Sequence, residues 1–294
     1  MKKSSLKNTH EQNLLLIALG MTLVIILGGI DLSVGSLVAM CGVITVSAIT
    51  QSGIPVAIAV TIGLLLGVLA GFLNGFLIAQ FKVPAFIITM AMMNITRGVA
   101  YLYTGGRATR IFEESFNFIG SGYVLGIPIP IIYSVVLVAV FSVFLNKTRF
   151  GIYIYAVGGN QEAARLSGVP IKKVIIICYV ISGFMSAFAG LVLCARMFSG
   201  QPSIGDGYEL DAIAACVLGG ISMSGGIGKI SGTVFGAITI GMISNGLNLM
   251  NVSSYWQYVA KGIIIVIAIL IDAQKNNNKM KIMMQKRADA LKQK

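Results

Sequence analysis

Long apolar runs separated by short polar segments fill most of the chain. The runs are continuous and not alternating, so they predict helices and not the strands of a β-barrel. A helical run of this length can cross about 30 Å of hydrocarbon, although the first two runs and the seventh are short and indicate broken or re-entrant spans. The fold class is therefore all-α, a polytopic membrane protein with about nine spans or broken spans. We place the runs at 13–28, 36–51, 54–79, 84–104, 129–145, 174–195, 211–224, 230–250 and 255–271.

The polar segments divide the chain into a polar N-terminal segment at 1–12, a membrane domain at 13–272 and a basic tail at 273–294. The longest internal polar stretch, 146–173, has five basic residues against the single acid Glu162, and short basic loops stay on the cytoplasmic side of a membrane. Its basic residues are Lys147, Arg149, Arg165, Lys172 and Lys173.

Within this loop, Asn160 is a suitable N-cap for a short helix over 161–167, which Gly168 and Pro170 would end. Such a helix between two spans could be a handle for a cytosolic partner, and an ordinary solvated loop is the alternative.

A cytoplasmic central loop fixes the predicted topology. The segments 105–128 and 197–211 then lie outside, and the tail 273–294 returns to the cytosol with its excess of basic residues. Counting back places 1–12 outside, although Lys2, Lys3 and Lys7 favour the cytosol. Either the first span is not a full crossing, or an N-terminal helix of the intact architecture is absent from this sequence, which is the interpretation that we favour.

Composition supports a membrane protein and excludes several other classes. The chain is 56% hydrophobic and 11% charged, whereas soluble domains carry roughly 25% charged residues. Its net charge of +12 comes from basic residues that flank spans, so we expect no nucleic-acid partner. The four cysteines lie in apolar runs without CxxC spacing and His10 is the single histidine, so neither a disulfide framework nor a metal site is expected.

The sequence also lacks signatures of catalysis. Residues 225–230 do not complete a phosphate-binding loop, because Met223 stands where a glycine is needed and Ile230 where Ser or Thr is needed. The HExxH and GxSxG patterns are missing as well. We therefore expect a protein that is not an enzyme and holds no cofactor of its own.

Glycines form two patterns. Gly63, Gly67, Gly71 and Gly75 recur every four residues, which places them on one helix face where another helix can approach closely. The breaks 28–35 and 219–226 resemble each other, and paired interruptions of this kind indicate an internal repeat around a pathway.

Polar residues inside the spans mark either contacts between helices or a solute path. Amides can exchange hydrogen bonds with the hydroxyls of a neutral solute, whereas Arg97 could equally pair with a backbone carbonyl. Near the seventh run, Asp211 is a candidate helix cap, and Glu209 is a candidate for docking a basic partner surface. The candidates inside spans are Asn74, Thr89, Asn94, Arg97, Asn245 and Asn248.

Several motifs resemble the permease subunit of bacterial ABC importers for ribose and related monosaccharides. They are GGIDLSVGS at 28–36, NKTRFG at 146–151, GGNQEAARLSG at 158–168, YELDAIAACVLGG at 208–220, NGLNL at 245–249 and SSYWQ at 253–257. The resemblance implies a homodimer in the bacterial inner membrane with a cytoplasmic C-terminus, an ABC ATPase subunit that binds the ATP, and an extracytoplasmic sugar-binding protein. Family members usually carry another transmembrane helix ahead of the position of Asn13.

The resemblance also assigns roles to residues. It implies that the segment from Gly159 to Gly168 couples to the ATPase. The polar residues within the spans, and not the resemblance, predict a translocation path that contains Asn74, Asn94, Asn245 and Asn248. Glu209, in the predicted external acidic run, is the predicted contact of the binding protein. The coupling residues are Gly159, Asn160, Glu162, Ala163, Arg165 and Gly168.

Two other functions stay open at the level of sequence. An ion-coupled secondary transporter would need ionisable residues buried in the spans, where Asp31 and Arg97 are the near candidates. An ABC permease for amino acids or another small solute would share the architecture and differ only in its cargo.

Overall fold

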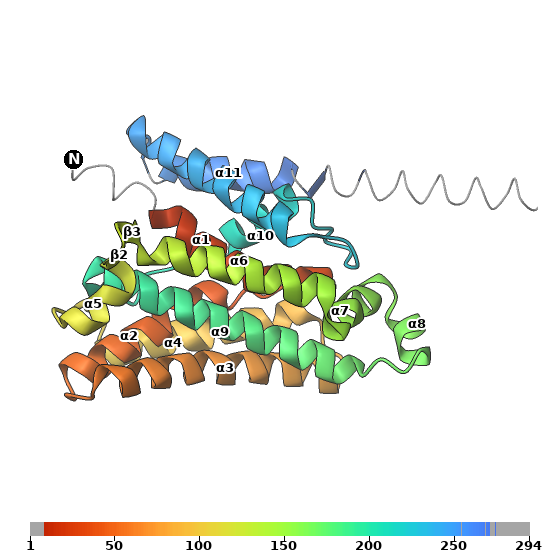
Figure 1. Cartoon of the computed structure of the whole chain (residues 1–294), viewed down its shortest axis with the longest axis horizontal. Coiled ribbons are helices and arrows are strands. Elements are labelled where there is room, and N and C mark those ends of the chain that lie inside the picture. Colours follow the sequence, from red (N-terminus) through yellow and green to blue (C-terminus); the bar gives the residue numbers. More distant parts are fainter. Residues whose placement is uncertain (1–8, 254, 268, 271–273, 275–294) are drawn as a thin grey trace, which may run out of the picture.

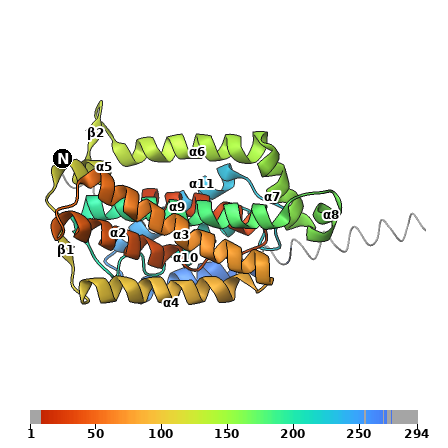
Figure 2. The same ribbon diagram turned by 90° about the horizontal axis from the view of Figure 1, so that it is seen from below.

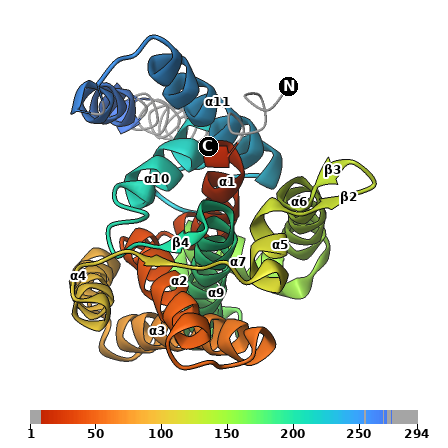
Figure 3. The ribbon, with the colours of Figure 1, turned by 90° about the vertical axis from the view of Figure 1, so that its left-hand side faces the viewer.

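Helix α9 (Ile171–Met197) runs through the middle of a bundle of helices (Figures 1 and 3). This computed structural model describes residues 9–253, 255–267, 269–270 and 274. Three helices pack around α9: α1 (Thr9–Ile26), α2 (Val34–Thr50) and α3 (Val56–Phe81). Most of the C-terminal two thirds of α9 is buried, so this helix is the centre of the fold.

The other long helices surround this centre. α4 (Ala85–Thr104) and α6 (Ile129–Lys147) lie on opposite sides of the bundle (Figure 2). α10 (Tyr208–Leu218) and α11 (Ile230–Leu249) pack against each other and against α1, and a further helix, Tyr255–Ile267, follows. The short helices are α5 (Glu114–Ser121), α7 (Arg149–Gly159) and α8 (Gln161–Leu166).

The helices agree with the predicted apolar runs. Among the described residues, α3, α4, α6, α9 and α11 are long and apolar enough to cross a membrane, and Gln12–Ile26, α2 and Tyr255–Ile267 are shorter apolar helices. The seventh run is short, as predicted: α10 has 11 residues, which span roughly 16 Å. It cannot cross a bilayer alone.

The connections gather at two opposite ends of the bundle (Figure 1). At one end, which we call the hairpin end, β1 (Thr109–Arg110) pairs antiparallel with β4 (Ser199–Gly200). The hairpin of β2 (Tyr123–Val124) and β3 (Ile127–Pro128) lies at the same end. α7 and α8 lie at the other end, called the α8 end below. Of the segments predicted to lie outside, 105–128 and the start of 197–211 lie at the hairpin end, whereas Gly205 packs against Gly35, at the start of α2.

Helix α1 runs from one end to the other. Near its beginning, the Gln12 amide oxygen accepts a hydrogen bond of 3.3 Å from Arg196, at the hairpin end. At its end, the Ile26 carbonyl accepts one of 2.7 Å from the Gly226 N–H, close to α7. The apolar part of α1, Gln12–Ile26, is nevertheless shorter than the helices that are long enough to cross a membrane, so an incomplete first crossing stays a prediction. Residues 1–8 and the tail 275–294 lie outside the described residues.

The glycine stripe of α3 packs against α9. A β-carbon at Gly67 would lie 2.5 Å from both the Gly183 carbonyl oxygen and the Ala187 β-carbon, and one at Gly71 would collide with the Tyr179 backbone. The opposite face of α3 is exposed and apolar, with Leu65 and Leu69 more than half exposed. The stripe therefore lets two backbones touch while the other face meets lipid, which confirms the predicted packing role.

This contact predicts a selective effect of a single methyl group. Gly71→Ala should lower the free energy of unfolding by about 1–3 kcal/mol, because backbone atoms of α9 cannot give way as a side chain can. Gly98→Ala in α4 is the matched control, since a β-carbon there meets nothing within 4 Å, and its higher helix propensity should leave the protein equally or slightly more stable. Thermal unfolding of the two purified variants in the same detergent measures this. Equal unfolding midpoints for both variants would refute the close contact.

Candidate functional site

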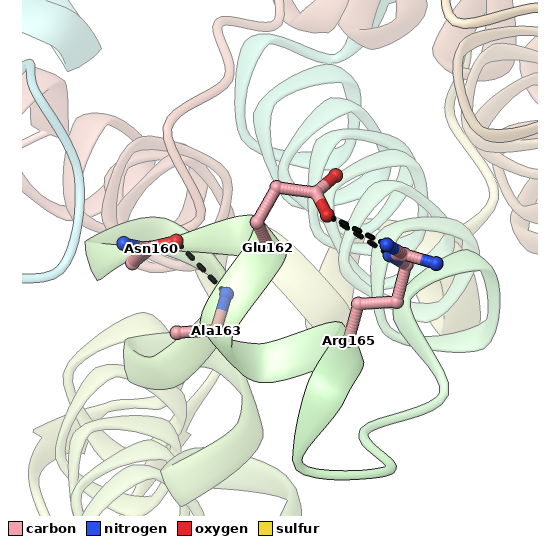
Figure 4. Close-up of polar contacts among 4 residues, drawn as sticks. All are labelled: Asn160, Glu162, Ala163 and Arg165. Atoms are coloured by element: carbon pink, nitrogen blue, oxygen red, sulfur yellow. Dashed lines mark hydrogen bonds and ion pairs between the residues drawn. The ribbon is translucent and has the colours of Figure 1, made fainter.

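The helix α8 is defined by local capping at both ends, as predicted. The Asn160 side-chain oxygen accepts a 2.9 Å hydrogen bond from the Ala163 N–H (Figure 4). At the other end, Gly168 has a φ of +79° and its N–H bonds to the Arg165 carbonyl at 3.0 Å. Glycine adopts this left-handed conformation without steric cost, so the chain can turn at once toward α9.

Most of α8 faces outward. The methyl group of Ala164 is buried and holds the helix against the bundle, whereas Leu166 is 81% exposed. Glu162 and Arg165 form an ion pair of 2.9 Å on the exposed surface, with 75% and 64% of their side chains accessible (Figure 4). The six predicted coupling residues thus lie in one exposed segment, 159–168, which comprises the last residue of α7, the helix α8 and the residues that cap it.

The end of α7 connects α8 to the interior. A β-carbon on Gly158 would collide with the Ile26 carbonyl and with the Gly226 N–H, so three backbone segments meet here without side chains between them. The Tyr155 hydroxyl donates a 2.7 Å hydrogen bond to the Gly228 carbonyl. Burial raises the pKa of the Tyr155 phenol further above its ordinary value, which already lies well above physiological pH, so the hydroxyl is a donor here.

This junction joins the two glycine-rich breaks. A β-carbon built on Gly225, in the second break, would lie 3.1 Å from the α-carbon of Gly28, in the first break, and 2.7 Å from the Gly158 carbonyl oxygen. The sequence indicated that the two breaks resemble each other but not that they touch. The signal that could have indicated contact is the glycine at all three positions, because only glycine permits such an approach.

The first break is held inside the bundle by a buried carboxylate. Asp31 Oδ1 accepts hydrogen bonds from the Ser33 N–H at 3.0 Å and the Ser33 hydroxyl at 2.6 Å, and Oδ2 accepts one from the Ser182 hydroxyl at 2.8 Å. The Ile30 carbonyl accepts hydrogen bonds of 3.3 Å from the hydroxyls of Thr89 and Tyr179. α4 and α9 therefore supply the partners that the unwound backbone lacks.

The four predicted path amides are not assembled into one site within the described chain. Asn74 is buried and donates a 3.0 Å hydrogen bond to the Ser33 hydroxyl, which places it in the Asp31 network. Asn94 bonds its own helix at the Met90 carbonyl, and Asn248 accepts from Gln257. Asn245 is half-buried. Asn74 thus joins helices, and the translocation role of the four amides stays a prediction.

Arg97 also contacts backbone. Its guanidinium donates hydrogen bonds of 2.9 Å and 2.8 Å to the carbonyls of Pro202 and Ile204, in the loop that precedes α10. The sequence left open whether Arg97 contacts a solute or pairs with a backbone carbonyl, and in the structure it pairs with carbonyls. Arg97 thereby ties α4 to the 201–207 loop.

The two acids at the start of α10 differ from their predicted settings. Asp211 does not cap the helix, which begins at Tyr208 after Gly207; it is buried and forms a 2.6 Å ion pair with Lys261. One carboxylate oxygen of Glu209 is buried beside Gly35, without a hydrogen-bond partner. This oxygen faces inward, so the geometry gives no support to docking by Glu209, which stays a prediction.

Comparisons with known proteins identify the type of chain. The family described as "branched-chain amino acid transport system / permease component" matches residues 12–269. The chain is 45% identical to the ribose import permease of Haemophilus influenzae and 48% identical to that of Bacillus subtilis, over 90% and 89% of this chain and 83% and 81% of those proteins. It is 46% identical to the L-arabinose transport system permease of Escherichia coli, over 90% of this chain and 80% of the relative. No solved structure gives a significant match.

The Asp31 network generates a paired prediction on α9. Ser182→Ala removes the donor to Asp31 Oδ2 and leaves a buried carboxylate oxygen unpaired, which should lower the free energy of unfolding by about 1–3 kcal/mol. Ser186→Ala is the control, because that buried hydroxyl bonds only the Ser182 carbonyl one turn back, and its loss should be nearly neutral. Thermal unfolding distinguishes the two, and a neutral Ser182→Ala would show that the network does not hold the break.

Proposed function

The chain belongs to the permease family of bacterial ABC importers, and we propose that it forms the membrane path for ribose or a related monosaccharide. It is a multi-pass membrane protein and a transport component, not an enzyme. The observation that carries the substrate class is the 45–48% identity to ribose and L-arabinose permeases over about nine tenths of the chain. This identity favours a sugar over the amino acids that the family description names.

The proposed energy source is ATP hydrolysis on a separate ABC ATPase subunit that docks on α8. Three features support this role: α8 is exposed, capped at both ends, and separated from α7 by Asn160 alone. A force applied to α8 would pass directly to Gly158, at the end of α7. Gly158 would then push on the backbones of Ile26 and Gly226, which it contacts. Repacking of the two breaks would then change access to the path.

The proposed orientation places α8 in the cytoplasm of a bacterial cell. Its end of the bundle carries a strong excess of basic side chains, with Glu162 already paired to Arg165, and this excess is typical of the cytoplasmic side. The cytoplasmic C-terminus belongs to the same proposal, since residues 275–294 lie outside the described chain. The basic residues at the α8 end include Lys82, Lys147, Arg149, Arg165, Lys172, Lys173 and Lys229.

The hairpin end would then face the extracytoplasmic sugar-binding protein. Glu113 and Glu114, which follow β1 at the start of α5, are exposed there, and these acids are better placed for a basic partner than the inward oxygen of Glu209. A second copy of the chain completes the proposed assembly. The exposed apolar surface of α4 and of Tyr255–Ile267 is available to lipid or to that second copy.

Asp31, the buried acid that the sequence offered for ion coupling, gives little support to such a mechanism. Such a mechanism needs a carboxylate that exchanges a proton or ion during transport. Asp31 already accepts three hydrogen bonds from Ser33 and Ser182, which fixes it as part of the fold.

Charge changes on α8 test the coupling role. Glu162→Arg and Arg165→Glu should each reduce stimulation of the ATPase by on the order of tenfold, because a charge misplaced in a docking surface costs about 1.4 kcal/mol or more. The exchanged double variant, Glu162→Arg with Arg165→Glu, restores an ion pair within the helix but presents the charges in reverse. It should remain uncoupled, while all three variants reach the membrane at normal levels, because exposed pairs add little to stability. Recovery of stimulation in the double variant would assign the pair to helix stability alone.

Uptake into proteoliposomes tests the substrate class. The chain, with its cognate ATPase and binding protein, should accumulate labelled ribose or L-arabinose when ATP is enclosed with the ATPase, and should not accumulate labelled leucine. Leucine uptake would assign an amino-acid permease. Sugar uptake by the chain alone, driven by an ion gradient without ATP, would instead establish a secondary transporter.

A further inference from the structure

A cavity of about 790 Å³ opens at the α8 end, between α8, the end of α3 and the start of α9. Its inner wall is apolar and buried, and includes Leu27, Ala79 and Val157. Its rim is basic and exposed. The basic residues that line it are Lys82, Arg165, Lys172 and Lys173.

The positive charge of the rim is incompletely balanced. The one acid of the lining, Glu162, is already paired with Arg165. Lys172 donates a 2.8 Å hydrogen bond to the neutral amide of Gln80. In the described part of the chain, no carboxylate lies within ion-pair distance of Lys82 or Lys173. The cavity therefore favours an anion at its mouth.

The start of α9 adds to this positive potential. Lys172 and Lys173 lie in its first turn, where the helix dipole disfavours cations, and the N-cap Pro170 provides no side-chain acceptor. The sequence thus accumulates like charges at an unfavourable position. An anion bound between them would relieve the repulsion.

The surroundings of the rim indicate that this anion has an apolar body. Phe81 and Phe86, on either side of Lys82 in the sequence, are 64% and 48% exposed. In a membrane protein, exposed apolar rings of this kind are available to hydrocarbon, so the basic rim lies directly beside surface that acyl chains can cover. A basic pocket between helices in such a position is suited to a lipid headgroup, with the acyl chains along the apolar wall.

We propose that this cavity binds the phosphate headgroup of an anionic phospholipid. The phosphate lies between Lys82 and Lys173, and the acyl chains follow the ends of α3 and α9. Because Gln161, Glu162 and Arg165 line the same cavity, the lipid braces α8 against the bundle. If α8 couples to the ATPase, this bracing makes coupling depend on anionic lipid. That dependence rests on the proposed function, whereas lipid binding itself does not.

Photo-crosslinking tests the site without the ATPase or sugar. The full chain in phosphatidylcholine nanodiscs containing a trace of photoactivatable phosphatidylglycerol should be labelled, and peptide mapping should place the label on α3 or α9 near the cavity. The Lys82→Gln/Lys173→Gln variant should lose labelling by on the order of tenfold. The control, Lys147→Gln/Lys229→Gln, removes the same charge from the same end but from residues outside the lining, and should be labelled normally.

Three control measurements have outcomes that would contradict the proposal or support it. Equal labelling by a photoactivatable phosphatidylcholine, or an equal loss in both double variants, would overturn a specific anionic site. Loss of labelling in the presence of millimolar inorganic phosphate, at constant ionic strength set with chloride, would assign the site to free phosphate and overturn the lipid. Matching thermal unfolding midpoints for the two variants would show that a loss of labelling is not a loss of fold. Because the assay contains no transport step, its outcome does not depend on the proposed import of sugar.

Discussion

Unwound backbone inside a membrane bundle must find hydrogen-bond partners within the protein, because the surrounding hydrocarbon offers none. The first break lies at such a depth: Ser33 bonds Asn74, which is seven residues, or roughly 10 Å, from the end of α3. Asp31 accepts hydrogen bonds from Ser33, within the break, and from Ser182, on α9, and so substitutes for the bonds of a missing helical turn. The hydroxyls of Thr89 and Tyr179 serve the Ile30 carbonyl. The path of the chain from α1 to α2 depends on this set of contacts.

The backbone of the second break also needs hydrogen-bond partners, and it finds one beside the first break. Its Gly226 N–H donates a hydrogen bond to the Ile26 carbonyl, at the end of α1, and the Gly228 carbonyl, two residues beyond the break, accepts one from the Tyr155 hydroxyl. Glycine at 158 allows these backbones to touch, so a displacement of α7 cannot be absorbed by a side chain changing its rotamer. The hydrogen bonds that make the breaks stable thus also connect them mechanically to α8.

The features that the sequence predicted well are governed by neighbouring residues. The apolar runs predicted the helices because the hydropathy of each run depends only on its own residues. Asn160 was identifiable as a cap because its side-chain acceptor and the N–H donor of Ala163 are three residues apart. The Asp31 network could not be predicted, since Asn74 bonds a residue 41 positions away and Ser182 one 151 positions away. Asp211 illustrates the competition directly: local preference suggested a cap, and Lys261, 50 residues later, takes the carboxylate instead.

The polar groups that the fold does not use bear on where a solute passes. Asn74 and Ser182 each donate to the first break, although the Asn74 side-chain oxygen is buried without a hydrogen-bond partner in the described chain, and Arg97 donates to the 201–207 loop. Asn94 and Asn248 are exposed on α4 and α11, and among the described residues only part of each amide is hydrogen-bonded. Exposed amides within spans are costly against lipid but not against water. A second copy that enclosed these faces around an aqueous passage would remove that cost, so the proposed dimer and the proposed path depend on the same surfaces.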